Sequence, residues 1–303
     1  MTPGDTEATG MKPNQHFPSV DRDKCIGCGL CMEACPAFVL DVTKEKAWVV
    51  RSDWCIGCGQ CGAICPVQAI AFSTITLERH PQPGAQSAVP SEALELLLRE
   101  RRSVRIYEKE PIPEEVLRRI LDAGKHAPTG RNSQNVHYVI LKSPEEIDRL
   151  RKMTLGFYEK LFSRVKGRFS AFLFGLFAGH KITESLREAL PKVEYAQTLM
   201  EQGKDCLFYH APVIMVAHAE SWDTCSAFNC AVALYNCSLM AHTLRVGCCF
   251  NGYLVSAINH DTQIKKGLNI PRDHQCFAAM TLGYQKIRYT RLVERESPKA
   301  TWR

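Results

Sequence analysis

The sequence predicts a protein of the α+β class, with a small N-terminal domain followed by a larger C-terminal one. Two runs of four cysteines lie close together in the first quarter of the chain, and a segment rich in Pro, Gly and Ser follows them. Beyond that segment, predicted helices dominate over strands, which favours α+β over a doubly wound sheet. We expect a disordered leader at 1–16, a small domain at 17–80, a linker at 81–90 and the larger domain at 91–303.

The two cysteine runs have the spacing C-x2-C-x2-C-x3-C-P, which is typical of thiolates that hold [4Fe–4S] clusters. The first three cysteines of a run can wrap one cluster, whereas the fourth lies too far along the chain and ligates the other cluster. The alternatives are zinc knuckles and disulfides, but zinc sites have a longer gap between their two ligand pairs. The spacing therefore predicts one cluster on Cys25, Cys28, Cys31 and Cys65 and a second on Cys55, Cys58, Cys61 and Cys35. This stretch resembles bacterial two-cluster ferredoxins.

The small domain contains an internal repeat. Asp23-Lys-Cys-Ile-Gly-Cys recurs 30 residues later as Asp53-Trp-Cys-Ile-Gly-Cys. Glycines between the ligands let the backbone approach the sulfides and point its N–H groups at them. Short strands are expected at 48–50 and 69–72. A domain with so few apolar residues would assemble its core around the clusters.

Composition excludes several classes of function. The chain has 303 residues, 45% hydrophobic and 23% charged, as in ordinary globular proteins. Its net charge of +6 comes without a dense basic tract, so we expect no nucleic-acid partner. The longest apolar run, 169–179, is about half the length of a bilayer span, and no signal peptide is evident. Seven further cysteines lack ligand spacing and indicate buried thiols in a reducing, cytoplasmic setting: Cys206, Cys225, Cys230, Cys237, Cys248, Cys249 and Cys276.

The larger domain begins at Ser91, which is expected to cap a helix over 92–101. Pro113 starts a second helix, whose Val116, Leu117, Ile120 and Leu121 share one face. Apolar runs predict strands at 137–141, 212–217 and 277–282, a helix from about 144, and a long central helix over 227–244. The Phe-rich stretch 169–179 fits a substrate lid, a dimer contact or a plain core helix. The ten histidines are interpreted as core or surface residues.

Four segments of this domain are candidates for a binding site. Arg101, Arg102, Ser103 and Arg105 offer forked, permanently charged donors and a hydroxyl, as a phosphate requires. The turn at 127–134 offers amide groups for the edge of a flavin ring. The third segment, 245–253, directly follows the long helix, and a basic tail with Lys286, Arg288 and Arg291 ends the chain.

In this order, over about 200 residues, the segments resemble the nitroreductase family of FMN-dependent flavoproteins. The resemblance implies that the first group contacts the FMN phosphate and ribityl chain, and that Arg288 or Arg291 also binds the phosphate. It implies a homodimer, because the turn would reach FMN across the subunit interface through Pro128, Thr129, Gly130 and Asn132. Asn251 and Gly252 match the segment that places a backbone N–H beside flavin N5. Asn135-Val136 replaces the family's usual Pro-Trp, which puts the adjoining pocket wall in doubt.

The combination indicates an FMN-dependent oxidoreductase of nitroreductase type. Single electrons would pass through two [4Fe–4S] clusters to FMN, which reduces a small organic acceptor such as a nitroaromatic, quinone or activated alkene. The donor would be a ferredoxin-type or other protein, or NAD(P)H, although no Rossmann motif is present. The alternatives are an electron-transfer or redox-sensing partner without small-molecule turnover, and a flavin-handling or cofactor-biosynthesis branch of the family. No side chain is identified as a catalytic acid.

Overall fold

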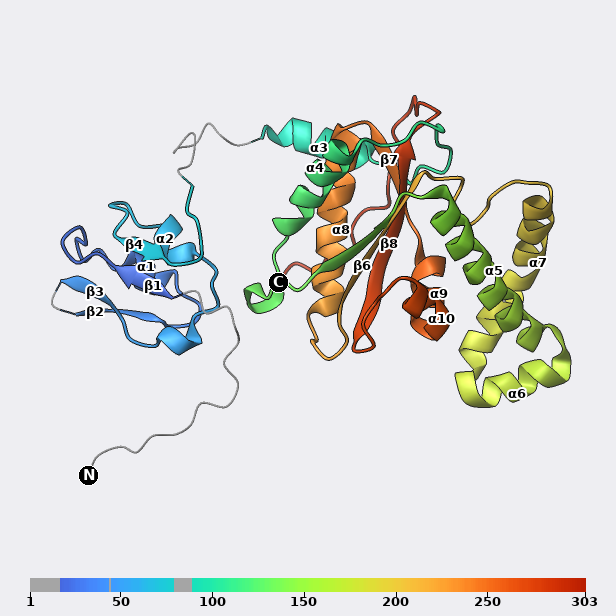
Figure 1. Ribbon diagram of the computed structural model, residues 1–303, viewed down its shortest axis with the longest axis horizontal. Coiled ribbons are helices and arrows are strands. Elements are labelled where there is room, and N and C mark those ends of the chain that lie inside the picture. The colour runs from blue at the N-terminus through green and yellow to red at the C-terminus, as the bar shows by residue number, and fades with distance from the viewer. Residues whose placement is uncertain (1–16, 44, 79–88) are drawn as a thin grey trace. The chain divides into compact units, whose positions relative to one another are not determined.

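The computed structural model describes residues 17–43, 45–78 and 89–303, which fall into two units (Figure 1). The first unit takes the described residues before Val89 together with Arg131–Ser133. The second takes Val89–Gly130 and Gln134–Arg303. The leader expected at 1–16 and the linker residues 81–88 lie outside the described residues.

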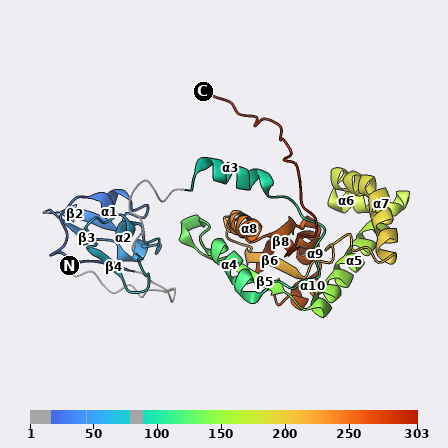
Figure 2. The same ribbon diagram turned by 90° about the horizontal axis from the view of Figure 1, so that it is seen from above.

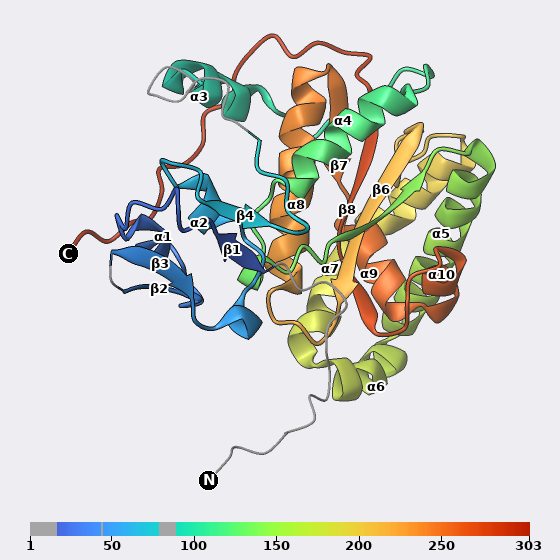
Figure 3. The same cartoon turned by 60° about the vertical axis from the view of Figure 1, so that its left-hand side comes forward.

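The first unit interleaves its two sequence repeats. Its strands pair antiparallel as β1 (Pro18–Val20) with β4 (Ile70–Phe72), and β2 (Leu40–Thr43) with β3 (Lys46–Val49) (Figure 3). Each pair joins one repeat to the other. The short helices α1 (Leu30–Glu33) and α2 (Gln60–Ala63) begin after left-handed glycines 30 residues apart, and a 3-10 turn, η1, spans Ser52–Trp54. The structure thus confirms the repeat and adds β1 and β2, which the sequence pattern did not predict.

The core of the first unit is built largely on its cysteines. Cys25, Cys31 and Cys61 are buried together with Val39 and a few other aliphatic side chains. Three more cysteines of the two runs, Cys35, Cys55 and Cys65, pack against this cluster and are partly buried. A core with so little apolar mass needs additional cross-links, as the sequence suggested.

The second unit contains an antiparallel sheet of order β5-β6-β8-β7. Its central strands are strongly apolar because both faces of the sheet are covered. One cluster of buried side chains joins the sheet to α4 and α8, and the other joins it to α5, α9 and α10 (Figure 2). The strands span His137–Leu141 (β5), Val213–Glu220 (β6), Val246–Phe250 (β7) and His274–Tyr284 (β8).

The helices of the second unit largely follow the predicted pattern. The expectation for Ser91 was wrong: it is the first residue of α3, and Pro90 occupies the N-cap without a side-chain hydrogen bond. The sequence pattern had not indicated β7, α7, α9 or α10. The helices span Ser91–Glu100 (α3), Glu114–Lys125 (α4), Pro144–Lys166 (α5), Arg168–Ala178 (α6), His180–Glu201 (α7), Ser226–Thr243 (α8), Gly252–His260 (α9) and Thr262–Gly267 (α10).

The Phe-rich helix α6 is not a plain core helix. Its Ala171 is buried, but Phe169, Phe172, Leu173 and Leu176 are exposed. Among the described residues, none of the helices combines the length and apolarity needed to cross a membrane.

Candidate functional site

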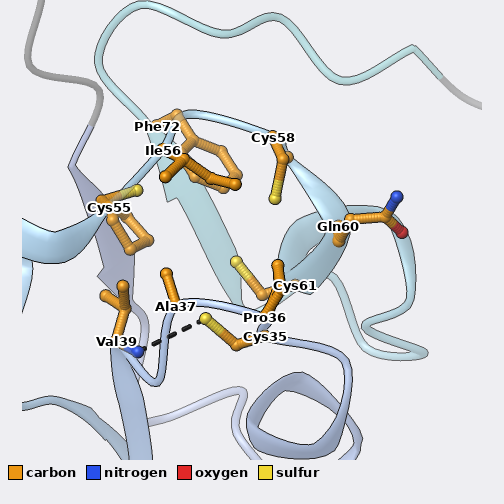
Figure 4. A pocket seen from close by; sticks show the side chains of 12 residues that line it. Cys35, Pro36, Ala37, Val39, Cys55, Ile56, Cys58, Gln60, Cys61 and Phe72 are labelled. Carbon is orange, nitrogen blue, oxygen red and sulfur yellow. Dashed lines mark hydrogen bonds between the residues drawn. The ribbon is translucent and has the colours of Figure 1, made fainter. Parts of the chain in front are cut away.

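Two cavities in the first unit are lined by the predicted cluster ligands. In each, three cysteines come from one run and the fourth from the other, because the crossed strand pairs bring the two repeats together. Figure 4 shows the first cavity, with sulfurs converging from both repeats. The lining cysteines are Cys35, Cys55, Cys58 and Cys61 in this cavity and Cys25, Cys28, Cys31 and Cys65 in the other. These are the two combinations that the spacing predicted.

Backbone amides point at the sulfurs of both cavities. The amide of Val39 donates to Cys35 Sγ at 3.3 Å, and that of Ala69 donates to Cys65 Sγ at 3.2 Å, in equivalent positions of the repeat. The Ala47 amide donates to Cys25 Sγ at 3.4 Å and is the main cause that lowers the pKa of this thiol. Such hydrogen bonds stabilise a thiolate and tune the potential of an attached cluster.

Burial works in the opposite direction at other ligands. It raises the pKa of Cys61 to about 12 and that of Cys31 and Cys55 above the ordinary value. A thiolate at such a position requires a positive charge beside it, and bound iron supplies that charge. The cysteine sets therefore fit iron–sulfur clusters.

Glycines between the ligands keep the backbone close. Gly27 has φ +68°, and a Cβ on it would lie 2.2 Å from the carbonyl oxygen of Glu45. Gly57, its equivalent in the second repeat, also has a positive φ of 62°. Only glycine combines this conformation with such close packing at no steric cost.

In the second unit, the segment Arg101–Arg105, which is predicted to bind a phosphate, lies along the edge strand β7. The Val104 amide donates to the Cys248 carbonyl at 2.9 Å, which extends the sheet beyond β7. Burial raises the pKa of Cys248 to about 11, while the adjacent Arg101 acts to lower it. The guanidinium carbon of Arg105 lies 5.8 Å from the Tyr209 ring, and that of Arg102 lies 5.8 Å from the Tyr289 ring. The sequence pattern had not singled out either tyrosine.

The arginines of this group have no carboxylate partner among the residues that the structure describes. The Nε of Arg101 is buried and has no hydrogen-bond partner among the described residues. Within the described ranges, no carboxylate forms an ion pair with Arg101, Arg102 or Arg105. A buried, unpaired guanidinium nitrogen is costly unless an anion binds it, so this group fits a phosphate.

The basic tail starts beside the same group. Tyr107 pairs with Gln285, and the Lys286 amide donates to the Ile106 carbonyl at 3.0 Å. Arg288 and Arg291 follow in the tail and are exposed. The fold therefore brings the beginning of the tail to the Arg101–Arg105 segment.

The predicted flavin-edge turn is divided between the two units, and its residues up to Gly130 belong to the second. The Gly130 amide donates to Asn229 Oδ1 at 3.0 Å, and Thr129 Oγ1 accepts from the Gln134 amide at 3.0 Å, while Pro128 is exposed. Asn132 belongs to the segment grouped with the first unit. There its Nδ2 donates to the carbonyls of Ile56 and Gly57, at 3.2 and 3.0 Å.

Within a single chain, the Arg101–Arg105 segment and the turn at 127–134, both predicted to contact FMN, are far apart. Gly130 binds Asn229 in the first turn of α8, whereas Glu100, next to Arg101, lies 3.6 Å from His242 in the last turn. At 1.5 Å per residue, these two points on α8 are about 20 Å apart. The Arg101–Arg105 segment and the turn are therefore at opposite ends of α8.

Asn251 and Gly252 have different environments. The Asn251 side chain is buried and fully engaged, because its Oδ1 accepts from the Leu254 amide at 2.9 Å and its Nδ2 donates to the Leu207 carbonyl at 2.7 Å. It thus caps α9. Gly252 is exposed, and no atom lies within 4 Å of the position of a Cβ on it. A ligand therefore has room above Gly252 rather than at the Asn251 side chain.

Comparison with known proteins agrees with this architecture. Residues 98–284 match the nitroreductase family, and residues 13–72 match a 4Fe-4S dicluster domain. A curated NADH dehydrogenase of Thermus thermophilus is 41% identical over 56 residues, 18% of this chain, which spans 27% of that protein's length.

Solved structures similar to the chain include two nitroreductases with bound FMN. The Bacteroides fragilis protein is 23% identical, covering 68% of this chain and 95% of that one, with a TM-score of 0.49. The Desulfitobacterium hafniense protein is 21% identical, covering 69% and 96%, also with a TM-score of 0.49. The family match extends over more than half of the chain and confirms the resemblance that the motifs suggested. The chain belongs to the nitroreductase family of FMN-dependent oxidoreductases and carries a 4Fe-4S dicluster domain at its N-terminal end.

Proposed function

We propose that this protein is an iron–sulfur flavoprotein that passes single electrons through two [4Fe–4S] clusters to FMN for the reduction of a small organic acceptor. The observation that carries the proposal is the pair of cavities, each lined by four cysteines in the crossed combination. When bound, the clusters exchange one electron at a time, and FMN exchanges one or two. A nitroaromatic, quinone or activated alkene is the expected class of acceptor.

The residues of the chain would hold and tune these groups. The eight ligand cysteines would bind iron, with the amides of Val39, Ala47 and Ala69 as donors to ligand sulfurs. Arg101, Arg102, Ser103 and Arg105, with Arg288 or Arg291, would bind the FMN phosphate. Pro128, Thr129, Gly130, Asn132 and Gly252 remain the proposed contacts to the rest of the flavin, whereas Asn251 would act by positioning Gly252.

We also propose a homodimer, which is supported by the distance between the two sets of residues proposed to bind FMN. One chain places them about 20 Å apart along α8, which favours a shared site in which a second copy supplies the turn. Apolar side chains support such an interface: Phe228 and Tyr235 are exposed on α8, and Leu94, Leu96 and Leu98 are exposed on α3. Exposed apolar surface of this kind is characteristic of association sites.

The dimer is tested by Phe228→Glu, with Tyr195→Glu on α7 as a control at a similarly exposed aromatic residue. We expect the first variant to sediment as a monomer and lose FMN, and the second to stay dimeric. A wild-type protein that is monomeric with one FMN per chain would contradict the shared site.

We expect a reduced ferredoxin-type protein to be the donor, since an enzyme fed by NAD(P)H alone would not need the cluster module. Iron–sulfur clusters and many free thiols also fit a reducing compartment such as the cytoplasm. Cys58→Ser removes one ligand of the cavity in Figure 4 and should remove one cluster. FMN reduction by ferredoxin should then be slow, with FMN content unchanged.

The matched control is Cys206→Ser, which changes a half-buried cysteine outside both cavities. Anaerobic bleaching of the flavin is followed with reduced ferredoxin, NADH and NADPH offered separately. If Cys58→Ser, with its iron content halved, turned over with the donor as fast as the wild type, the electron path through the clusters would be refuted. Flavin reduction without turnover of any acceptor would identify an electron-transfer protein instead.

A further inference from the structure

Three histidines and a glutamate gather at one end of the sheet in the second unit. His137 begins β5, His218 and Glu220 lie near the end of β6, and His274 begins β8. The register pairs His137 with His218 and Glu220 with His274. Because paired residues, and residues two apart, project from the same face, the four side chains are neighbours on that face.

Three of these side chains converge on one point. A ligand atom from each of His137, Glu220 and His274 lies within 4.8 Å of the other two. In a tetrahedral zinc site with metal–ligand distances of 2.0 to 2.2 Å, ligand atoms are roughly 3.4 Å apart. Small side-chain rotations would therefore close the triad around an ion. His137 is exposed, Glu220 half-buried and His274 buried, so solvent can reach a fourth coordination position.

Hydrogen bonds from neighbouring residues orient two of the three ligands. Nδ1 of His274 lies 2.9 Å from Nδ1 of the buried His218, which leaves Nε2 of His274 for a metal. Asn135 Nδ2 donates to Glu220 Oε2 at 2.9 Å, and Asn135 Oδ1 accepts from Asn229 Nδ2 at 3.0 Å. Ligating histidines and carboxylates are typically held by such second partners.

We propose that His137, Glu220 and His274 form a binding site for a divalent transition-metal ion of the Zn²⁺ type. Two imidazoles and one carboxylate suit Zn²⁺ and its neighbours in the series, whereas Mg²⁺ and Ca²⁺ prefer oxygen ligands. The site contains no cysteine. It is also separate from the Arg101–Arg105 segment. That segment lies beside Cys248, which pairs with Leu282, and Leu282 is eight residues and about 26 Å from His274 along β8. A bound ion would cross-link the ends of three strands.

Zinc binding is measured on the cluster-loaded full chain by equilibrium dialysis, with zinc and iron determined together. The wild type should bind one more zinc per chain than His137→Ala, with the same iron content, and zinc should raise its Tm. Glu220→Gln should also lose the site. Asn135→Ala should weaken zinc binding by about 10- to 100-fold, as expected for loss of a partner that orients a ligand.

The control variant is His180→Ala, an exposed histidine on α7 outside the cluster. His137 is exposed, so its replacement should leave the fold intact, which the Tm in a zinc-free buffer checks. The proposal is overturned if wild type, His137→Ala and Glu220→Gln bind equal zinc at saturation. It is also overturned if zinc enters only as iron is lost, since the metal would then occupy the cysteine cavities.

Discussion

Replacement of Asn251 tests whether this residue supports the fold rather than contacting the flavin. Asn251→Ala removes the N-cap of α9, which costs about 1 kcal/mol. It also leaves the Leu207 carbonyl, the acceptor for Asn251 Nδ2, without its partner, which costs about 1–3 kcal/mol. The free energy of unfolding should therefore fall by roughly 2–4 kcal/mol. For a unit of this size the Tm should fall by roughly 5–15 °C.

The assay is thermal unfolding of the FMN-free protein, followed by far-UV circular dichroism. Asn251→Ser keeps a capping oxygen but does not reach Leu207, so it should recover about 1 kcal/mol of the loss. Asn259→Ala is a matched control, because Asn259 also makes two hydrogen bonds to backbone groups, those of Cys276, outside the proposed site. An unchanged Tm of FMN-free Asn251→Ala, together with weaker FMN binding, would refute the structural role and favour direct contact.

Two further predictions concern the cysteines and the glycines beside them. Gly27→Ala and Gly29→Ala share the cost of about 1–2 kcal/mol for a side chain at positive φ, but only at Gly27 does the new Cβ collide with backbone. Only Gly27→Ala should therefore lower the iron and sulfide content of the protein markedly. Equal contents in the two variants would contradict this. In native, cluster-loaded protein, alkylation should reach the half-buried Cys206 and Cys225 first, because reagent has better access to them than to the buried thiols. Five buried thiols should remain unmodified at pH 9, since burial raises their pKa, to about 12 for three of them: Cys230, Cys237, Cys248, Cys249 and Cys276. Mass spectrometry that finds any of these five labelled before the protein unfolds would refute this prediction.

Several elements were predictable because their signals are local. Pro113 and Pro144 mark the starts of α4 and α5, and the continuous apolar run before Glu220 marks β6. By contrast, β7 was not predicted, because Val246–Phe250 has two cysteines and a glycine in place of an alternating pattern. It becomes a strand through pairing with β8 along its whole length.

The sequence by itself determined the family and its N-terminal 4Fe-4S domain, and it predicted the same grouping of the eight cysteines that lines the two cavities. These depend on short spacings, and the reach of a few peptide units limits which thiolates can meet around one cluster. Tertiary structure decided where Arg101 and Gly130 lie along α8, which separates the residues proposed to bind FMN within one chain. It also brought together His137, Glu220 and His274. No local pattern connects these three residues, because the register of strands far apart in sequence sets their proximity.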